Sequence, residues 1–216
     1  MGLRRQAEDL HGDVPPDWYH RSIRENPLQR FWHGRRFAQA RSLLLPAEGR
    51  VLDVGCADGV FTEVIADATG AAEVIGVDVL ESSVAWAAEH WRHRPEMRFV
   101  GCDAHELPFP DAHFDAVTCM EMLEHVFDVP RALGEMRRVL RPGGYALLLV
   151  PSDSPLFRLV WAAWTKTRGR IWEDTHIQSF RGGALGRAAR DAGFEVEVDR
   201  RFLLGMLSIV RARKAV

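Results

Sequence analysis

Residues 51–62, Val-Leu-Asp-Val-Gly-Cys-Ala-Asp-Gly-Val-Phe-Thr, decide the fold of this 216-residue chain. They predict a buried strand over residues 50–54, a glycine-rich turn and a helix that begins near Val60. Gly55 and Gly59 suit such a turn, because glycine adopts positive φ and lets the backbone come close to a ligand. The stretch therefore predicts a ligand-binding loop between a strand and a helix.

The acidic residues of this loop narrow the choice of ligand. The spacing Asp53-x-Gly55-x-Ala57-x-Gly59 differs from the phosphate-binding Gly-x-Gly-x-x-Gly, and no Lys-Ser or Lys-Thr pair follows as in a P-loop. Asp53 and Asp58 place negative charge where a pyrophosphate would lie. We therefore expect a ligand with a cationic or neutral polar group.

Strand and helix patterns alternate after this loop, which predicts a doubly wound α/β sheet with its ligands at the carboxyl ends of the strands. The length suits one domain, residues 1–216. The expected strands span 73–78, 97–101, 114–119, 145–150, 194–199 and 203–213, the last two as an antiparallel pair. The expected helices span 27–45, 82–93 with Ser82 as N-cap, 130–140 and 180–192 with Gly193 as C-cap, while residues 1–17 are expected to be loosely ordered.

An acidic residue, Asp78, ends the second strand about 20 residues after the glycines, where a carboxylate accepts hydrogen bonds from ribose hydroxyls. With this residue in place, residues 51–62 resemble the first motif of class I S-adenosylmethionine (SAM) dependent methyltransferases. That family usually has acidic-x-Gly-x-Gly-x-Gly, and Ala57 here takes the place of the middle glycine. The extra methyl group is tolerated if φ at Ala57 is negative.

The resemblance covers about residues 50–150 and implies a Rossmann-like, doubly wound sheet of seven strands. It also implies an N-terminal lid region over residues 1–46, with a lid helix, and a helical insertion after strand five that shapes the acceptor pocket (residues 151–180). SAM is the implied cofactor, with Asp78 on the ribose and Asp103 on the adenine amino group. The implied cofactor-binding residues are Asp53, Gly55, Cys56, Ala57, Gly59, Asp78, Val79, Asp103, Ala104 and Met120.

Two carboxylates and an imidazole follow the fourth strand in Glu121-x-x-Glu124-His125. If a helix begins at Glu121, the side chains at i+3 and i+4 lie on its face and converge beside the cofactor. Such a set suits Mg²⁺ or another divalent cation, with His176 as a fourth ligand. Two alternatives stay open: His125 acts without a metal as a base or substrate contact, or the motif is structural.

The stretch from Cys119 to Val126, Cys-Met-Glu-Met-Leu-Glu-His-Val, is similar to the ubiquinone-pathway O-methyltransferases. With the later His176 it also resembles small-RNA 3′-terminal 2′-O-methyltransferases, and in both families the motif is associated with a divalent metal. The predicted function is methyl transfer from SAM to a hydroxyl of a small lipophilic or phenolic acceptor. The alternatives are metal-free N- or C-methylation of a sugar or secondary metabolite, RNA 2′-O-methylation, and a non-catalytic SAM-binding module.

The composition and the distribution of charge favour some kinds of binding partner over others. Residues 50–150 carry 17 acidic and 8 basic side chains, whereas both flanks are basic. A pI near 6.5 disfavours nucleic acid as a partner. Arginines and aromatic residues mix in residues 18–41, and apolar residues precede a basic cluster in 155–170. These stretches predict either lid and pocket elements or, in addition, peripheral membrane contact. Three unpaired cysteines and the lack of a signal peptide or an apolar span favour a cytoplasmic location.

Overall fold

The computed structural model describes residues 3–166, 169–172 and 175–216, and these residues build a seven-stranded sheet in the order β3-β2-β1-β4-β5-β7-β6. β1 to β5 are parallel and β7 is antiparallel to both of its neighbours. The doubly wound, seven-stranded α/β prediction is therefore confirmed. The strands are β1 Arg50–Val54, β2 Glu73–Asp78, β3 Met97–Gly101, β4 Phe114–Met120, β5 Leu140–Pro151, β6 Phe194–Phe202 and β7 Leu207–Lys214.

Helices cover both faces of the sheet, which explains why the central strands are mainly apolar. α6 (Val129–Val139) and α8 (Ala184–Asp191) pack on one face and bury Leu133, Met136 and Leu185 there. α3 (Pro27–Arg41), α4 (Val60–Thr69) and α5 (Glu81–His90) pack on the other face. Two cores, one on each side of the sheet, thus hold the strand ends in place.

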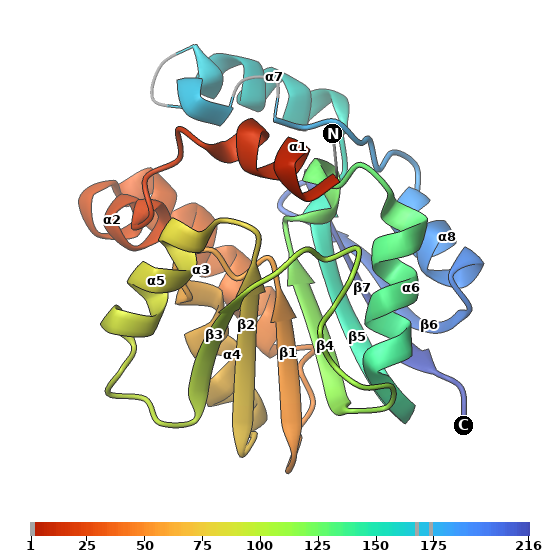
Figure 1. The fold of residues 1–216 in the computed structure, drawn as a ribbon. Coiled ribbons are helices and arrows are strands. Elements are labelled where there is room, and N and C mark those ends of the chain that lie inside the picture. The colour runs from red at the N-terminus through yellow and green to blue at the C-terminus, as the bar shows by residue number, and fades with distance from the viewer. Residues whose placement is uncertain (1–2, 167–168, 173–174) are drawn as a thin grey trace.

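The remaining helices cross the end of the sheet at which the parallel strands finish (Figure 1). They are α1 (Leu3–His11), α2 (Trp18–Glu25) and α7 (Pro155–Thr165), together with the short 3₁₀ helices η1 (Leu123–His125) and η2 (Arg170–Trp172). In a doubly wound sheet this end binds the ligand, so these elements form its cover.

Several sequence predictions about helices were wrong. Residues 1–17 contain α1 instead of loose chain, and the helix expected over 27–45 ends at Arg41. α5 begins at Glu81, so Ser82 lies inside its first turn and is not its N-cap. The expected helix over 180–192 is shortened to α8, because Gly182 and Gly183 adopt positive φ just before it.

The connection after β4 also differs from the prediction. No helix begins at Glu121, whose φ of 55° is left-handed and incompatible with a helix start. The chain makes the single turn η1 instead. The i, i+3 and i+4 arrangement that was to bring Glu121, Glu124 and His125 onto one helix face is therefore absent.

Candidate functional site

The loop after β1 folds tightly against β2. The backbone N–H groups of Gly55 and Cys56 both donate to the carbonyl of Val77, over 2.8 and 3.0 Å. A side chain at Gly55 would place its Cβ 2.5 Å from Cγ of Met122, and φ there is 79°, so glycine is required. The condition under which the methyl group of Ala57 was expected to be tolerated, a negative φ, is not met: its φ is 47°. The loop accepts this left-handed residue without a glycine.

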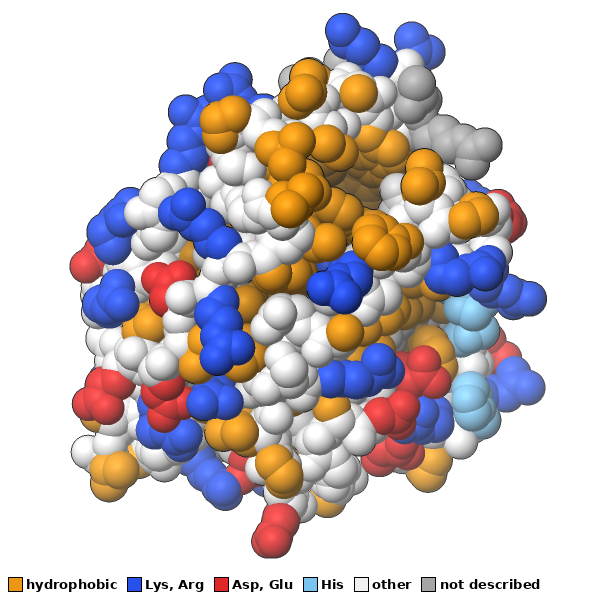
Figure 2. All heavy atoms as spheres, turned by 180° about the vertical axis from the view of Figure 1, so that it is seen from behind, with side chains coloured by type: hydrophobic (Ala, Val, Ile, Leu, Met, Phe, Trp, Pro, Cys, Tyr) orange, Lys and Arg blue, Asp and Glu red, His pale blue; other side chains and the backbone are white. Residues whose placement is uncertain are grey.

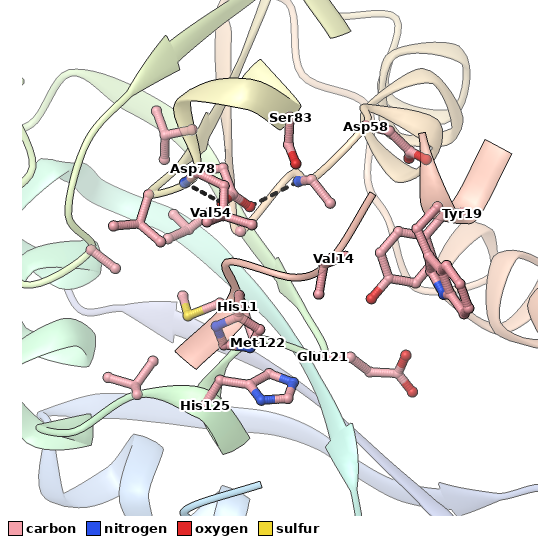
Figure 3. A pocket seen from close by; sticks show the side chains of 18 of the residues that line it. His11, Val14, Tyr19, Val54, Asp58, Asp78, Ser83, Glu121, Met122 and His125 are labelled. Carbon is pink, nitrogen blue, oxygen red and sulfur yellow. Dashed lines mark hydrogen bonds between the residues drawn. The ribbon is translucent and has the colours of Figure 1, made fainter. Parts of the chain in front are cut away.

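A cavity lies between this loop and the chain segments that cover it (Figure 3). Its floor comes from the ends of β1, β2 and β4, and its cover from the end of α1, the start of α2 and the segment between them. The covering residues are His11, Val14, Pro15, Pro16, Trp18 and Tyr19. Of the cofactor-binding residues predicted from the sequence, the cavity wall includes Gly55, Ala57, Asp78, Val79, Asp103 and Ala104.

Asp78 lies at the end of β2 and fixes the loop around it. Its two carboxylate oxygens accept the backbone N–H groups of Ala57 and Leu80, each over 2.9 Å. Burial raises the pKa of Asp78, and these two hydrogen bonds oppose that rise. A carboxylate held in this way keeps further lone pairs for a ligand's hydroxyl groups.

Asp103 faces the cavity from the connection after β3. One of its oxygens accepts the backbone N–H of His105 at 2.9 Å and the ring Nδ1–H at 2.6 Å. The Nε2 atom of the same imidazole accepts the backbone N–H of Asp128 at 3.2 Å. Asp103 is therefore oriented by a neighbour that is itself held in place.

Four of the predicted cofactor-binding residues are absent from the cavity wall: Asp53, Cys56, Gly59 and Met120. Asp53 is buried beneath the loop, where it accepts the hydroxyl groups of Thr62 and Thr118 over 2.7 and 2.8 Å. Burial raises its pKa to about 6. Asp53 thus ties the loop to α4 and β4, and Met122, not Met120, lines the cavity.

Asp58 links the loop to the cover. Its carboxylate accepts the backbone N–H of His20, the third residue of α2, at 2.7 Å. Burial raises the pKa of Asp58 to about 7, although backbone hydrogen bonds oppose the rise. The sequence had marked this residue only as a negative charge in the loop.

The helix expected to act as a lid, α3, packs against α4 and contributes no residue to the cavity wall. The lid is formed by α1, α2 and the Pro15-Pro16 turn instead. Trp172 of η2 completes it: its ring lies 6.0 to 6.2 Å from the rings of His11, Trp18 and Tyr19. Its indole N–H is buried and has no hydrogen-bond partner among the described residues.

Three of the four predicted metal ligands come together. One ligand atom from each of Glu124, His125 and His176 lies within 4.8 Å of the others. The fourth, Glu121, turns away from His125 (Figure 3) and pairs with Arg36 of α3. Glu121 and His125 line the cavity, whereas His176 lies behind it, with its ring 5.0 Å from that of His125.

A family described as a methyltransferase domain matches residues 27–198. The chain belongs to this methyltransferase family. It is 33% identical over 171 residues to a protein of Mycolicibacterium smegmatis described as a probable SAM-dependent methyltransferase, covering 78% of this chain and 61% of that relative. It is 30% identical over 206 residues to the ubiquinone biosynthesis O-methyltransferase of Leptothrix cholodnii, covering 92% and 84%.

Among solved structures, that of geranyl diphosphate methyltransferase in complex with GPP and sinefungin is similar, with a TM-score of 0.75 at 13% identity. The match covers 99% of this chain and 100% of that one, and it shows the shared fold. The methyltransferase is a SAM-dependent enzyme, as the resemblance implied. No helix among the described residues of the methyltransferase is both long and apolar enough to cross a membrane.

The cavity of the methyltransferase fits SAM on its own geometry. Gly55 lines the cavity, and Asp78 offers carboxylate lone pairs at the end where a ribose would bind. Asp58 and Glu121 lie on the same wall, where Arg36 pairs with Glu121 and burial raises the pKa of Asp58 to about 7. SAM supplies an activated methyl group, which leaves binding, orientation and exclusion of water to the protein.

Proposed function

We propose that the methyltransferase transfers the methyl group of SAM to a hydroxyl oxygen of a small lipophilic or phenolic acceptor. In this proposal Glu124, His125 and His176 hold a divalent cation. The observation that carries it is the grouping of these three side chains within 4.8 Å directly behind the cofactor cavity. The names of the relatives support the oxygen acceptor, because several are ubiquinone biosynthesis O-methyltransferases.

The donor set suits a cation. Nδ1 of His125 donates to the carbonyl of Thr175 at 2.8 Å, which leaves Nε2 with its lone pair free for a ligand. Burial lowers the pKa of His125 well below its usual value and that of His176 to about 4, so both rings are neutral at pH 7. Neutral imidazole is the form that ligates metals.

Glu124 would supply the negative charge once a cation displaces the proton that its raised pKa retains at pH 7. Its Oε2 atom is buried without a hydrogen-bond partner among the described residues, and burial raises the pKa of the carboxyl to about 8. A buried carboxylate that lacks a partner favours a positive ligand. The backbone carbonyl of Glu124 also accepts the N–H groups of Ile177 and Gln178, each at 3.0 Å, and so holds the segment after His176 against η1.

Such a site would promote deprotonation of the acceptor hydroxyl and hold it in position. A divalent cation supplies Lewis acidity, which lowers the pKa of a neighbouring hydroxyl and helps to fix its orientation. His125 lies on the cavity wall and Trp172 and Tyr19 close it, so the acceptor meets the cofactor away from bulk water. The protein therefore contributes alignment and a dry site.

Exposed apolar side chains support a peripheral membrane contact as part of the proposal. Leu28 and Phe31 of α3 are 79% and 63% exposed, and Leu159 of α7 is 69% exposed. Arginines flank both helices, which suits an anionic lipid surface. Sedimentation with vesicles containing phosphatidylglycerol, compared for the unchanged protein and Leu28→Ser/Phe31→Ser, tests this part: equal binding by both would contradict a contact through α3.

The main experiment uses SAM with a radiolabelled methyl group, the purified protein and a cell extract, with and without EDTA, followed by partition between organic solvent and water. We expect label in the organic phase that EDTA abolishes. Label confined to water and insensitive to EDTA would overturn the proposal in favour of metal-free N- or C-methylation of a sugar or secondary metabolite. Label in RNA would identify a nucleic-acid acceptor, and SAM binding without transfer would indicate a non-catalytic module.

Metal binding is tested directly with Mn²⁺ and electron paramagnetic resonance. Glu124→Gln and His176→Ala should each weaken Mn²⁺ binding about tenfold or more while leaving the affinity for S-adenosylhomocysteine unchanged. His93→Ala, an exposed histidine after α5, is the matched control. Mn²⁺ binding that is equal in all four proteins would remove the metal from the proposal.

A further inference from the structure

A second hollow lies beside the proposed metal site, between α7 and the segment that carries His176. It is a groove of about 710 Å³. Its lining residues are Asp153, Pro155, Phe157, Arg158, Leu159, Trp161, Ala162, His176 and Arg181. The view from behind shows hydrophobic side chains gathered around a hollow at the end of the molecule that α7 crosses (Figure 2).

The floor of this groove borders the cofactor cavity. The ring of His176 stacks on Trp161 at 4.2 Å and lies parallel to Phe157 at 6.1 Å. Its other side meets the edge of His125, whose ring lines the cofactor cavity. One end of a molecule in the groove would therefore lie beside His176, whose neighbour His125 lines the cofactor cavity.

The body of the groove is apolar and aromatic. Phe157 is buried in its wall, and the ring of Trp161 lies 5.6 Å from it in a stacked arrangement. Leu159 is largely exposed at the surface of α7. Such a surface gains free energy when an apolar chain covers it.

Two cations of the groove lack partners. The guanidinium groups of Arg158 and Arg181 form no hydrogen bond or ion pair with any residue that the structure describes. The single acid of the groove, Asp153, already accepts the backbone N–H of Phe180 at 3.1 Å. The groove thus combines an apolar body with an excess of positive charge, and guanidinium groups bind phosphates and carboxylates through paired hydrogen bonds.

We propose that this groove binds the methyl acceptor and that the acceptor carries an anionic group, a phosphate or carboxylate, on an apolar body. Arg158 and Arg181 receive the anion, Phe157 and Trp161 cover the apolar part, and the reacting end extends past His176 into the cofactor cavity. This inference rests on the proposed lipophilic acceptor and adds its charge and its place of binding.

The test measures binding of octyl phosphate and of 1-octanol to the full chain by calorimetry, with S-adenosylhomocysteine present. Both probes have the same alkyl chain, so their difference reports the anion. We expect octyl phosphate to bind at least about tenfold more tightly than octanol. Arg158→Gln/Arg181→Gln should abolish that difference while leaving the affinities for octanol and S-adenosylhomocysteine unchanged.

The matched control is Arg190→Gln, which changes an exposed arginine of α8 outside the groove and should leave both affinities as they were. Equal binding of the two probes to the unchanged protein would overturn the proposal, even if methyl transfer from SAM is intact. Vesicles with phosphatidylglycerol that bind through the two arginines, without binding of monomeric octyl phosphate, would also overturn it, because the anion would then be a bilayer headgroup. Failure of methyl transfer alone would instead contradict the proposed function.

Discussion

Arg36 of α3 and Glu121 at the end of β4 form an ion pair almost out of contact with water, with side chains 3% and 13% exposed. Arg36 also contacts Nδ1 of His33 at 2.9 Å and lies over the ring of Phe61 at 5.1 Å. Burial lowers the pKa of Arg36 to about 10, which leaves it charged at pH 7. The pair joins the helix layer behind the sheet to the wall of the cofactor cavity.

Removal of the Arg36 guanidinium should therefore destabilise the fold. Arg36→Met leaves the Glu121 carboxylate poorly solvated and unpaired, and we expect a loss of about 3 kcal/mol or more in the free energy of unfolding, measured with urea. Arg36→Met/Glu121→Gln should recover part of that loss, because no buried charge then lacks a partner. The exposed pair Arg92–Glu89 is the control: Arg92→Met should cost less than about 1 kcal/mol. Similar losses at both sites would contradict a buried, mutually dependent pair.

Asp78 offers a prediction about the cofactor. In Asp78→Asn the amide replaces one of two oxygens that accept backbone N–H groups, so the loop loses an acceptor and the cavity loses a charge. We expect the affinity for S-adenosylhomocysteine, measured by calorimetry, to fall about tenfold or more, in line with the loss of a charged hydrogen bond. Glu89→Gln on the exposed face of α5 should leave the affinity unchanged. An unchanged affinity in Asp78→Asn would remove this residue from the cofactor site.

Ala57 is held at a φ of 47°, a conformation that disfavours a side chain by about 1–2 kcal/mol. Ala57→Gly should release that strain at the expense of a more flexible unfolded chain, for a net gain of up to about 1 kcal/mol in the free energy of unfolding. Ala68→Gly inside α4 should have the opposite effect and lower the free energy of unfolding by about 0.5–1 kcal/mol. Destabilisation of equal size by both changes would contradict strain at Ala57.

The sequence predicted the sheet well because its signals are local. Apolar runs placed β1 to β4 to within one residue but missed the first five residues of β5, and Gly55 and Asp78 line the cavity at the end of the strands. It could not predict the left-handed backbone at Ala57 or Glu121, because the side chains there do not require it. The left-handed backbone of Glu121 prevents a helix from starting directly after β4. As a result Glu124, and not Glu121, lies beside His125.

The sequence placed a lid in residues 1–46, but the helical form of its first part was missed for a different reason. Short polar segments such as α1 are marginally stable as isolated helices, and their helical form depends on packing against distant residues. Trp172 and Asp58 hold this segment through contacts that span 38 or more residues of sequence, which one sequence does not reveal. Pro15-Pro16 followed by Trp18 and Tyr19 was the available signal for the lid.

Asp58 gives a prediction about pH. Burial raises its pKa from 3.8 to about 7 in the folded protein, so the folded state binds the proton more tightly than the unfolded state. Its contribution to the free energy of unfolding must then decline as pH rises from about 4 to about 7, and stay constant above. Asp58→Asn removes the titration and can still accept the N–H of His20. The free energy of unfolding of the unchanged protein, minus that of Asp58→Asn, should therefore fall across this pH range.

Urea unfolding at half-unit steps of pH from 4 to 8 measures that difference. Asp191→Asn, at the exposed end of α8, controls for the loss of one carboxylate in general. Parallel profiles for the unchanged protein and Asp58→Asn would show that Asp58 is hydrated in the folded state. Because Asp58 binds the first turn of α2 directly, such hydration would also mean that the lid does not stay closed over the loop in the absence of a ligand.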